Sequence, residues 1–128
     1  MVLVTGGAFQ GKKAYAMETF SLEEAVTADG ASCFWDDIYR AQAILHFHEY
    51  IRRCLEAGRE VDTLADRLFR RNPEAVIVVN ELGSGVVPVE AFDRHYRETT
   101  GRICCELAKR ASEVHRVVCG IGTVIKNG

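Results

Sequence analysis

The sequence lacks several features that would assign a protein to a class at once. It has no excess of one charge, because 16 Lys and Arg side chains stand against 18 Asp and Glu and leave a formal net charge of −2. It has no apolar run approaching the roughly 18 residues that a membrane-spanning helix needs. Its apolar first residues lack the basic flank and the length of a signal peptide. We therefore expect no nucleic-acid partner, no membrane span and a cytoplasmic location.

The cysteines also lack the patterns that signal a metal or redox site. The five of them, Cys33, Cys54, Cys104, Cys105 and Cys119, form no CxxC pair, and no HxxxH unit accompanies them. Their number is odd, and their density is far below that of a disulfide scaffold. We predict reduced structural thiols and no metal site built from protein ligands.

What the sequence does contain is an alternation of two hydrophobic patterns. Short continuous apolar runs, typical of buried strands, alternate with apolar residues at helical spacing. This alternation predicts an α/β fold, a three-layer sandwich with a mostly parallel sheet. The 128 residues, 48% of them hydrophobic, suffice for one core, so we expect a single domain over residues 1–128.

The expected elements follow from these patterns. Strands are predicted at Met1–Thr5, Ala25–Ala28, Ala75–Val79 and Val114–Cys119, and helices at 12–20, 36–57, 62–71 and from Pro88 to Ala111. The second helix is expected to be long and to stop at Gly58, a typical C-terminal residue. Gly101 interrupts the apolar stripe of the last helix and predicts a kink or close packing there.

A glycine-rich segment joins the first strand to the first helix and satisfies GxxxxGK. We name residues 6–12 the phosphate loop; with the next residue, the candidate nucleotide-binding set is Gly6, Gly7, Ala8, Phe9, Gln10, Gly11, Lys12 and Lys13. Successive backbone N–H groups at a helix N-terminus form an anion site, and Lys12 can reach the terminal phosphates of a nucleotide. The strand-to-helix context favours this interpretation over a simple glycine-rich turn, which stays open as an alternative.

Lys13 departs from the usual motif, in which a Ser or Thr hydroxyl follows the lysine and holds Mg²⁺. A protonated lysine cannot ligate a metal ion. Two interpretations stay open: the loop binds phosphate with altered metal handling, or it keeps the turn and has lost turnover. A role for Mg²⁺ is therefore doubtful.

Two carboxylates follow predicted strands at the edge where ligands of open α/β sheets bind. Glu81 follows the strand at Ala75–Val79, and Asp29 follows the weaker strand at Ala25–Ala28. Either can serve as a base toward a hydroxyl group or order a metal ion through water. With Lys12, they are the candidate catalytic residues, and the alternative for Glu81 is a carboxylate that caps the following turn.

The histidines offer little by sequence alone. His46 and His48 fall within the long predicted helix, two residues apart, so we expect them to point in different directions. His95 and His115 have no acid and nucleophile nearby in the sequence that would indicate a catalytic triad.

Several segments together resemble one known family. Leu3-Val-Thr-Gly-Gly-Ala-Phe-Gln-Gly-Lys12 looks like the GGxxSGKS opening of the adenosylcobinamide kinase / adenosylcobinamide-phosphate guanylyltransferase family, CobU. Residues 80–88 resemble its NEVGxGIVP, and residues 94–102 its RxFRDxxGR. Residues 107–114 resemble LAxxADEV, and residues 117–126 the closing VVxGIPLxIK. These segments cover about half of the chain, and we interpret it as a shortened, diverged member.

The resemblance implies a P-loop fold of the RecA type. It also implies ATP or GTP as the nucleotide, a kinase activity on the hydroxyl of the cobinamide aminopropanol arm in cobalamin biosynthesis, and a second activity that loads GMP onto the phosphate. It further implies a corrinoid as small-molecule partner and a homo-oligomer, commonly a trimer.

The departures from the family pattern gather at functional positions. The family carries GMP on a histidine in an HRxxRP-like stretch after the first helix, and nothing here matches it. Gln10 and Lys13 stand where the family has Ser. We therefore expect an adenosylcobinamide kinase-like nucleotide-binding protein without guanylyl transfer. The alternative is a non-catalytic relative that binds a nucleotide or corrinoid, or assembles with a partner, through a degenerate phosphate loop.

Overall fold

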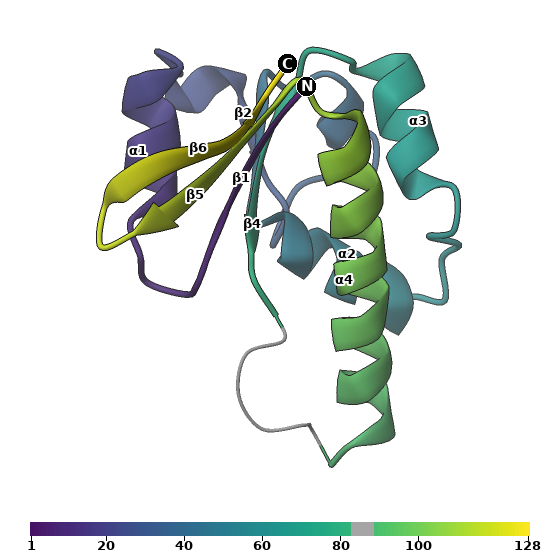
Figure 1. Cartoon of the computed structure of the whole chain (residues 1–128). Helices are drawn as coiled ribbons and strands as arrows, with labels where there is room; N and C mark the ends of the chain where they lie inside the picture. Colours follow the sequence, from purple (N-terminus) through teal and green to yellow (C-terminus); the bar gives the residue numbers. More distant parts are fainter. Residues whose placement is uncertain (83–88) are drawn as a thin grey trace.

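The computed structural model describes residues 1–82 and 89–128 as helices, strands and connections around one mixed sheet (Figure 1). The predicted start of the last helix at Pro88 lies outside the described residues. The strands are β1 (Val2–Gly6), β2 (Thr27–Asp29), β3 (Ala43–Leu45), β4 (Val76–Asn80), β5 (Glu113–Val118) and β6 (Ile121–Asn127), in the order β2-β3-β4-β1-β5-β6. The first five along the chain pair in parallel, and β6 pairs antiparallel with β5.

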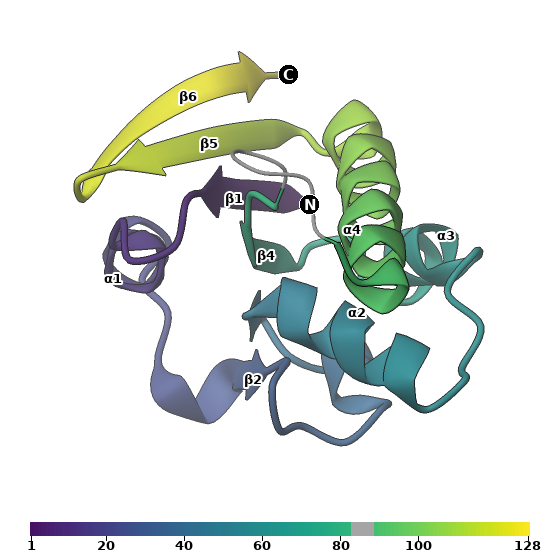
Figure 2. The same ribbon diagram turned by 90° about the horizontal axis from the view of Figure 1, so that it is seen from below.

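Helices cover both faces of this sheet and complete three layers. Helix α1 (Lys12–Thr19) lies on one face, and α2 (Phe47–Glu56), α3 (Leu64–Arg71) and α4 (Ala91–Arg110) lie on the other (Figures 1 and 2). Short 3-10 turns occur at Glu24–Val26 and Asp37–Tyr39. The predicted α/β three-layer sandwich with a mostly parallel sheet is therefore confirmed.

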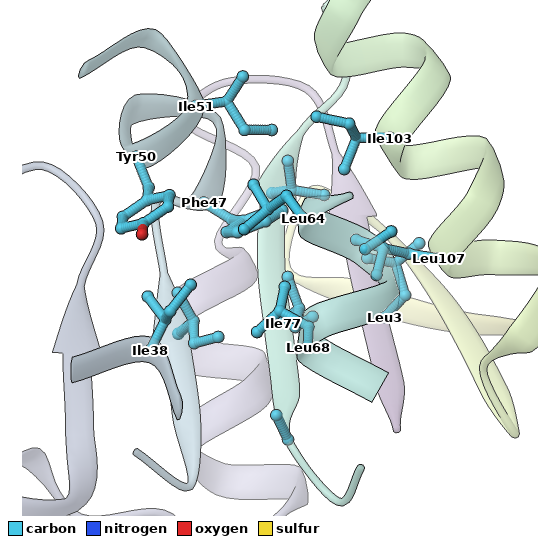
Figure 3. Packing of buried hydrophobic residues seen from close by; sticks show 14 of the residues in the cluster. Leu3, Ile38, Phe47, Tyr50, Ile51, Leu64, Leu68, Ile77, Ile103 and Leu107 are labelled. Carbon is cyan, nitrogen blue, oxygen red and sulfur yellow. The ribbon is translucent and has the colours of Figure 1, made fainter. Parts of the chain in front are cut away.

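The alternation of side chains along the central strands explains the two helical layers. In β4, Ile77 and Val79 face α2, α3 and α4, whereas Val76 and Val78 belong to the smaller cluster on the α1 side. Successive strand residues point to opposite faces, so a continuous apolar run needs cover on both. The larger cluster includes Phe47, Leu68 and Leu107, which converge on the sheet in Figure 3.

The single long helix predicted from Asp36 to Ala57 is wrong. The segment instead forms a 3-10 turn, the strand β3 and the helix α2. The side chains of Ala43, Ile44 and Leu45 are at most 3% exposed, because β3 pairs with β2 on one side and β4 on the other. Three apolar residues are too few to show a strand period, and they coincide by chance with the helical spacing around them. The predicted stop is confirmed, since Gly58 follows α2 with φ +68°.

The expectation about Gly101 also needs correction. Helix α4 runs without interruption through Gly101, and an added Cβ at Gly101 would meet no heavy atom within 4 Å outside the helix's own backbone, so nothing packs closely there. The edge strand β6 is not among the strands predicted from the sequence. None of the helices in the described part of the chain combines the length and the apolar character needed to cross a bilayer.

Candidate functional site

The carboxyl ends of the five parallel strands lie together at the lower edge of the sheet in Figure 1, which faces the viewer in Figure 2. The phosphate loop leaves this edge after β1 and leads into α1. Gly11 takes the helix N-cap position in the left-handed conformation, with φ +85°, which a residue with a side chain rarely adopts. The sequence thus places the backbone turn and the helix N-terminus as the motif predicts.

The lysine of the loop is buried rather than extended into solvent. Lys12 is 7% exposed, and its Nζ donates a hydrogen bond of 2.7 Å to the carbonyl oxygen of Gly7. Burial lowers the pKa of Lys12, and the nearby charge of Glu81 opposes this shift. The Lys12 amine therefore lies against the backbone of the phosphate loop.

The turn between β5 and β6 supports the loop from the side. The backbone N–H of Gly120 donates to the carbonyl oxygen of Gln10 at 2.7 Å, and that of Cys119 donates to the Gln10 side-chain Oε1, also at 2.7 Å. A Cβ on Gly6 would lie 2.5 Å from the Val117 carbonyl oxygen, so only glycine allows β1 to leave the sheet here. Gln10, which departs from the resembled motif, therefore has a structural contact of its own.

A pocket of about 470 Å³ opens beside the loop. Residues 8–14 form one wall, and Leu45, His46, His48, Val78 and Asn80 form the other. Six of the eight proposed nucleotide-binding residues line the pocket, namely those from Ala8 to Lys13. The other two, Gly6 and Gly7, directly precede this wall in the sequence.

Lys13 differs from Lys12 in its surroundings. Its side chain is half exposed, and its Nζ lies 3.0 Å from Glu24 Oε1. The ion pair joins the first turn of α1 to the 3-10 turn before β2. Lys13 is thus at the pocket rim with a carboxylate partner, whereas Lys12 is inside.

The two candidate carboxylates lie at the same sheet edge but both have basic partners. Glu81 receives hydrogen bonds from Arg116 Nε at 2.9 Å and from Arg116 Nη2 at 3.2 Å. Asp29 Oδ1 accepts the backbone N–H of Ala31 at 2.9 Å and lies 3.0 Å from His46 Nδ1. These hydrogen bonds lower the pKa of Asp29 although partial burial opposes them. Neither carboxylate is among the described residues that line the pocket.

Sequence reasoning missed the two histidines of the pocket wall. His46 is not helical: it stands between β3 and α2 in the left-handed conformation, with φ 52°. This turn brings the rings of His46 and His48 to 6.1 Å between centroids, so the expectation that they point apart is wrong. An identified strand at Ala43–Leu45 would have placed His46 at the ligand edge of the sheet.

His48 is buried and uncharged. Its Nδ1 accepts the backbone N–H of Asn80 at 3.1 Å, so that nitrogen carries no proton. Burial, and the nearby charges of His46 and Lys12, lower the pKa of His48 to about 4. The ring ties α2 to the end of β4 and presents a neutral surface to the pocket.

His115 also has partners that the sequence does not reveal. The ring is 4% exposed, with Tyr15 Oη 2.7 Å from Nδ1 and Glu113 Oε1 3.0 Å from Nε2. Glu113 thus supplies an acid beside His115, with the Tyr15 hydroxyl on the other ring nitrogen. Because Tyr15 belongs to α1, this network fixes the helix of the phosphate loop to β5.

Comparison with known proteins connects this geometry to a family. The family model for cobinamide kinase / cobinamide phosphate guanyltransferase matches residues 42–125. The bifunctional adenosylcobalamin biosynthesis proteins CobU of Escherichia coli strain K12 and Salmonella typhimurium strain LT2 are each 42% identical to this chain over 67 residues. That segment is 52% of this chain but only 37% of either relative, so the chain corresponds to much less than a whole relative.

The match begins at Gln42 and therefore includes His46, His48 and Asn80 but not the phosphate loop. The phosphate loop is identified by its motif and its conformation, whereas the family match rests on residues 42–125, which contain β3, β4, β5, most of β6 and the helices α2, α3 and α4. The family model covers more than half of the chain, and the resemblance noted from the sequence is confirmed. The chain belongs to the cobinamide kinase / cobinamide phosphate guanyltransferase family.

Proposed function

We propose that this chain binds the phosphate groups of ATP or GTP on the phosphate loop and transfers the terminal phosphoryl group to the hydroxyl of the cobinamide aminopropanol arm. The observation that carries the proposal is the pocket of about 470 Å³ between Lys12 and the strand ends. The backbone turn and Lys12 supply positive potential where a phosphate chain would lie. Family membership supplies the expected acceptor.

In the proposed reaction, the acceptor oxygen bonds to the terminal phosphorus as the bond from that phosphorus to the bridging oxygen breaks. A nucleoside diphosphate leaves, and the hydroxyl proton passes to a carboxylate, Asp29 or Glu81. Phosphoryl transfer relies mainly on positioning and charge stabilisation, so Lys12 contributes by holding negative charge on the transferred group. We infer no guanylyl transfer, because no segment resembles the HRxxRP-like stretch.

The second candidate is a non-catalytic relative that binds a nucleotide or corrinoid, alone or with a partner. The hydrogen bonds that engage Asp29 and Glu81 favour it, because they occupy carboxylate oxygens that a catalytic base would use to accept the hydroxyl proton. A homo-oligomer and a cytoplasmic location accompany both proposals.

Isothermal titration calorimetry with ATP and GTP tests binding, and Lys12→Ala is the variant of choice. Loss of the lysine charge should weaken nucleotide binding by about tenfold or more, the usual value of a charge-assisted hydrogen bond. Lys109→Ala, which changes an exposed lysine on α4, is the matched control and should bind as the unaltered protein does. Absence of heat with either nucleotide would contradict the kinase and the nucleotide-binding form of the second candidate.

Kinase and binder are separated by adding cobinamide and nucleotide and measuring nucleoside diphosphate. Product that depends on cobinamide supports the kinase. Binding without product supports the non-catalytic relative.

A further inference from the structure

We propose that the pocket binds the phosphate groups of its ligand without a divalent cation, and that the His46 imidazolium, held by Asp29, supplies part of the positive charge that a metal ion would supply. This inference rests on the proposed function. A phosphate-loop fold implies bound Mg²⁺, but the side chains at the positions that would hold this ion are not suitable ligands for it.

Mg²⁺ requires oxygen ligands, usually one or two carboxylates together with phosphates and water. In phosphate-loop proteins the residue after the loop lysine contributes a hydroxyl, and a carboxylate follows another strand of the sheet. Here the first position is Lys13, and the end of β3 presents His46. Ammonium and imidazolium groups repel a cation, so the two positions favour an anion directly.

The two carboxylates at this edge of the sheet, Glu81 and Asp29, are both hydrogen-bonded to protein groups. Glu81 is bonded through both oxygens to Arg116, and Asp29 is bonded to His46 and to the N–H of Ala31. Among the described residues, no group of three or more His, Cys, Asp and Glu side chains is arranged to hold a metal ion. The donor chemistry of the pocket thus comprises N–H groups and basic side chains.

The contact with Asp29 sets the tautomer and the orientation of the His46 ring. Asp29 is ionised at neutral pH, because its hydrogen bonds lower its pKa, and a carboxylate accepts but does not donate. The proton between them therefore lies on His46 Nδ1, and Nε2 is the ring nitrogen that remains to contact a phosphate. The ring is 49% exposed and lines the pocket, so a phosphate can reach it.

The charges around His46 come from three elements. Asp29 faces it from the end of β2, His48 and Glu49 belong to α2, and Lys12 and Lys13 come from α1. His48 is neutral, and Lys13 is paired with Glu24. Bound phosphate would offset the repulsion among Lys12, Lys13 and His46, so in the proposal these three basic side chains take the place of a metal ion.

Calorimetry with ATP and with tripolyphosphate, in EDTA and in Mg²⁺, provides the test. We expect binding in EDTA at least as tight as in Mg²⁺, and His46→Gln should weaken it by about tenfold or more. His95→Gln, an exposed histidine of α4, is the matched control and should leave the affinity unchanged. Binding that appears only with Mg²⁺ overturns this inference and leaves the proposed function standing. No binding under either condition overturns the proposed function itself.

Three further measurements separate a charged ligand contact from a structural role. In ¹⁵N spectra of the tripolyphosphate complex, both ring nitrogens of His46 should carry protons, whereas Nδ1 of His48 should carry none. Asp29→Asn should weaken binding and Asp29→Glu should restore part of it, as expected for a positioning residue. The double variant Lys13→Ser, His46→Asp should gain tightening by Mg²⁺. An unprotonated His46 Nε2 in the complex would contradict the assignment.

Discussion

A single buried imidazole, His48, connects the pocket wall to the stability of the fold. The ring is 5% exposed, and its Nδ1 holds the N–H of Asn80 at the end of β4. Protonation would remove this hydrogen bond and place a charge in an apolar environment near Lys12. His48 is therefore a residue whose charge state the folded structure selects.

The predicted consequence is a loss of stability in mildly acidic solution. The pKa of His48 falls from 6.5 to about 4 on folding. Between these values the unfolded chain binds a proton that the folded chain does not, so stability is present above pH 6.5 and falls as the pH drops toward 4. The free energy of unfolding should decrease by up to roughly 3 kcal/mol over this window. Urea unfolding at a series of pH values measures it.

His48→Gln is the comparison variant, because a glutamine carbonyl can accept the Asn80 N–H without titrating. Its stability should vary less with pH between 6.5 and 4. The pKa of Asp29 is already low and shifts further down on folding, so this carboxylate titrates mainly below that window. Equal pH dependence in the two proteins would contradict the role assigned to His48.

The candidate site residues show what spacing can and cannot indicate. The position of Lys12 follows from a local motif, and the strand-to-helix context was enough to expect a loop conformation there. His46 and Asp29 are 17 residues apart, and their contact exists because β2 and β3 pair in parallel with Asp29 opposite Leu45. No local pattern encodes that pairing.

At the scale of elements, alanine substitutions at two glycines, Gly30 and Gly101, should change the free energy of unfolding in opposite directions. An added Cβ on Gly30 would lie 2.3 Å from the His46 carbonyl oxygen, whereas one on Gly101 in the middle of α4 would meet nothing within 4 Å. Gly30 therefore permits the close approach of the β2 and β3 ends. Gly101 has no packing role and costs the helix conformational entropy.

Gly30→Ala should lower the free energy of unfolding by roughly 1–3 kcal/mol, because backbone must move to relieve the overlap. Gly101→Ala should raise it by about 0.5–1 kcal/mol, the usual gain of replacing glycine inside a helix. Chemical denaturation of the two variants beside the unaltered protein measures both. Changes of the same sign would mean that the two glycines do not differ as the structure indicates.

At the scale of the whole molecule, four of the eight large apolar side chains that are exposed in the described part of the chain lie on the last hairpin. Val118, Ile121, Val124 and Ile125 are between 47% and 72% exposed, and β6 forms an edge of the sheet (Figure 2). An apolar edge strand favours pairing with another chain. This is the surface that we expect to join copies of the chain in the proposed homo-oligomer.

Sedimentation velocity tests the assembly. The unaltered protein should sediment above the mass of one chain, and Ile125→Lys should shift it toward the monomer, because a charge on the edge opposes pairing. Phe34→Lys, which changes an exposed apolar residue in the segment after β2, the strand at the opposite edge of the sheet from β6, is the control and should not alter the mass. A monomer at all concentrations, or assembly that tolerates Ile125→Lys, would contradict the proposed interface.

The sequence by itself determined the elements whose signals are local and strong. Each of these signals lies within one segment: the apolar runs of β1, β4 and β5, the glycine-rich turn before α1 and the apolar stripe of α4. The type of each element and the three-layer class could therefore be predicted. The family resemblance came from the same kind of local signal in residues 3–12 and 80–126. The position of Lys12 at the start of α1 depends on one motif and could be predicted in the same way.

Only the tertiary structure decided which distant groups meet. It placed β3 inside the sheet, turned His46 toward Asp29, neutralised His48 against Asn80 and paired Glu81 with Arg116. Each of these results depends on parallel strand register and on burial, which sum over contacts between segments far apart in the chain. The character of the pocket, basic and without a lining carboxylate among the described residues, follows from those contacts rather than from any motif.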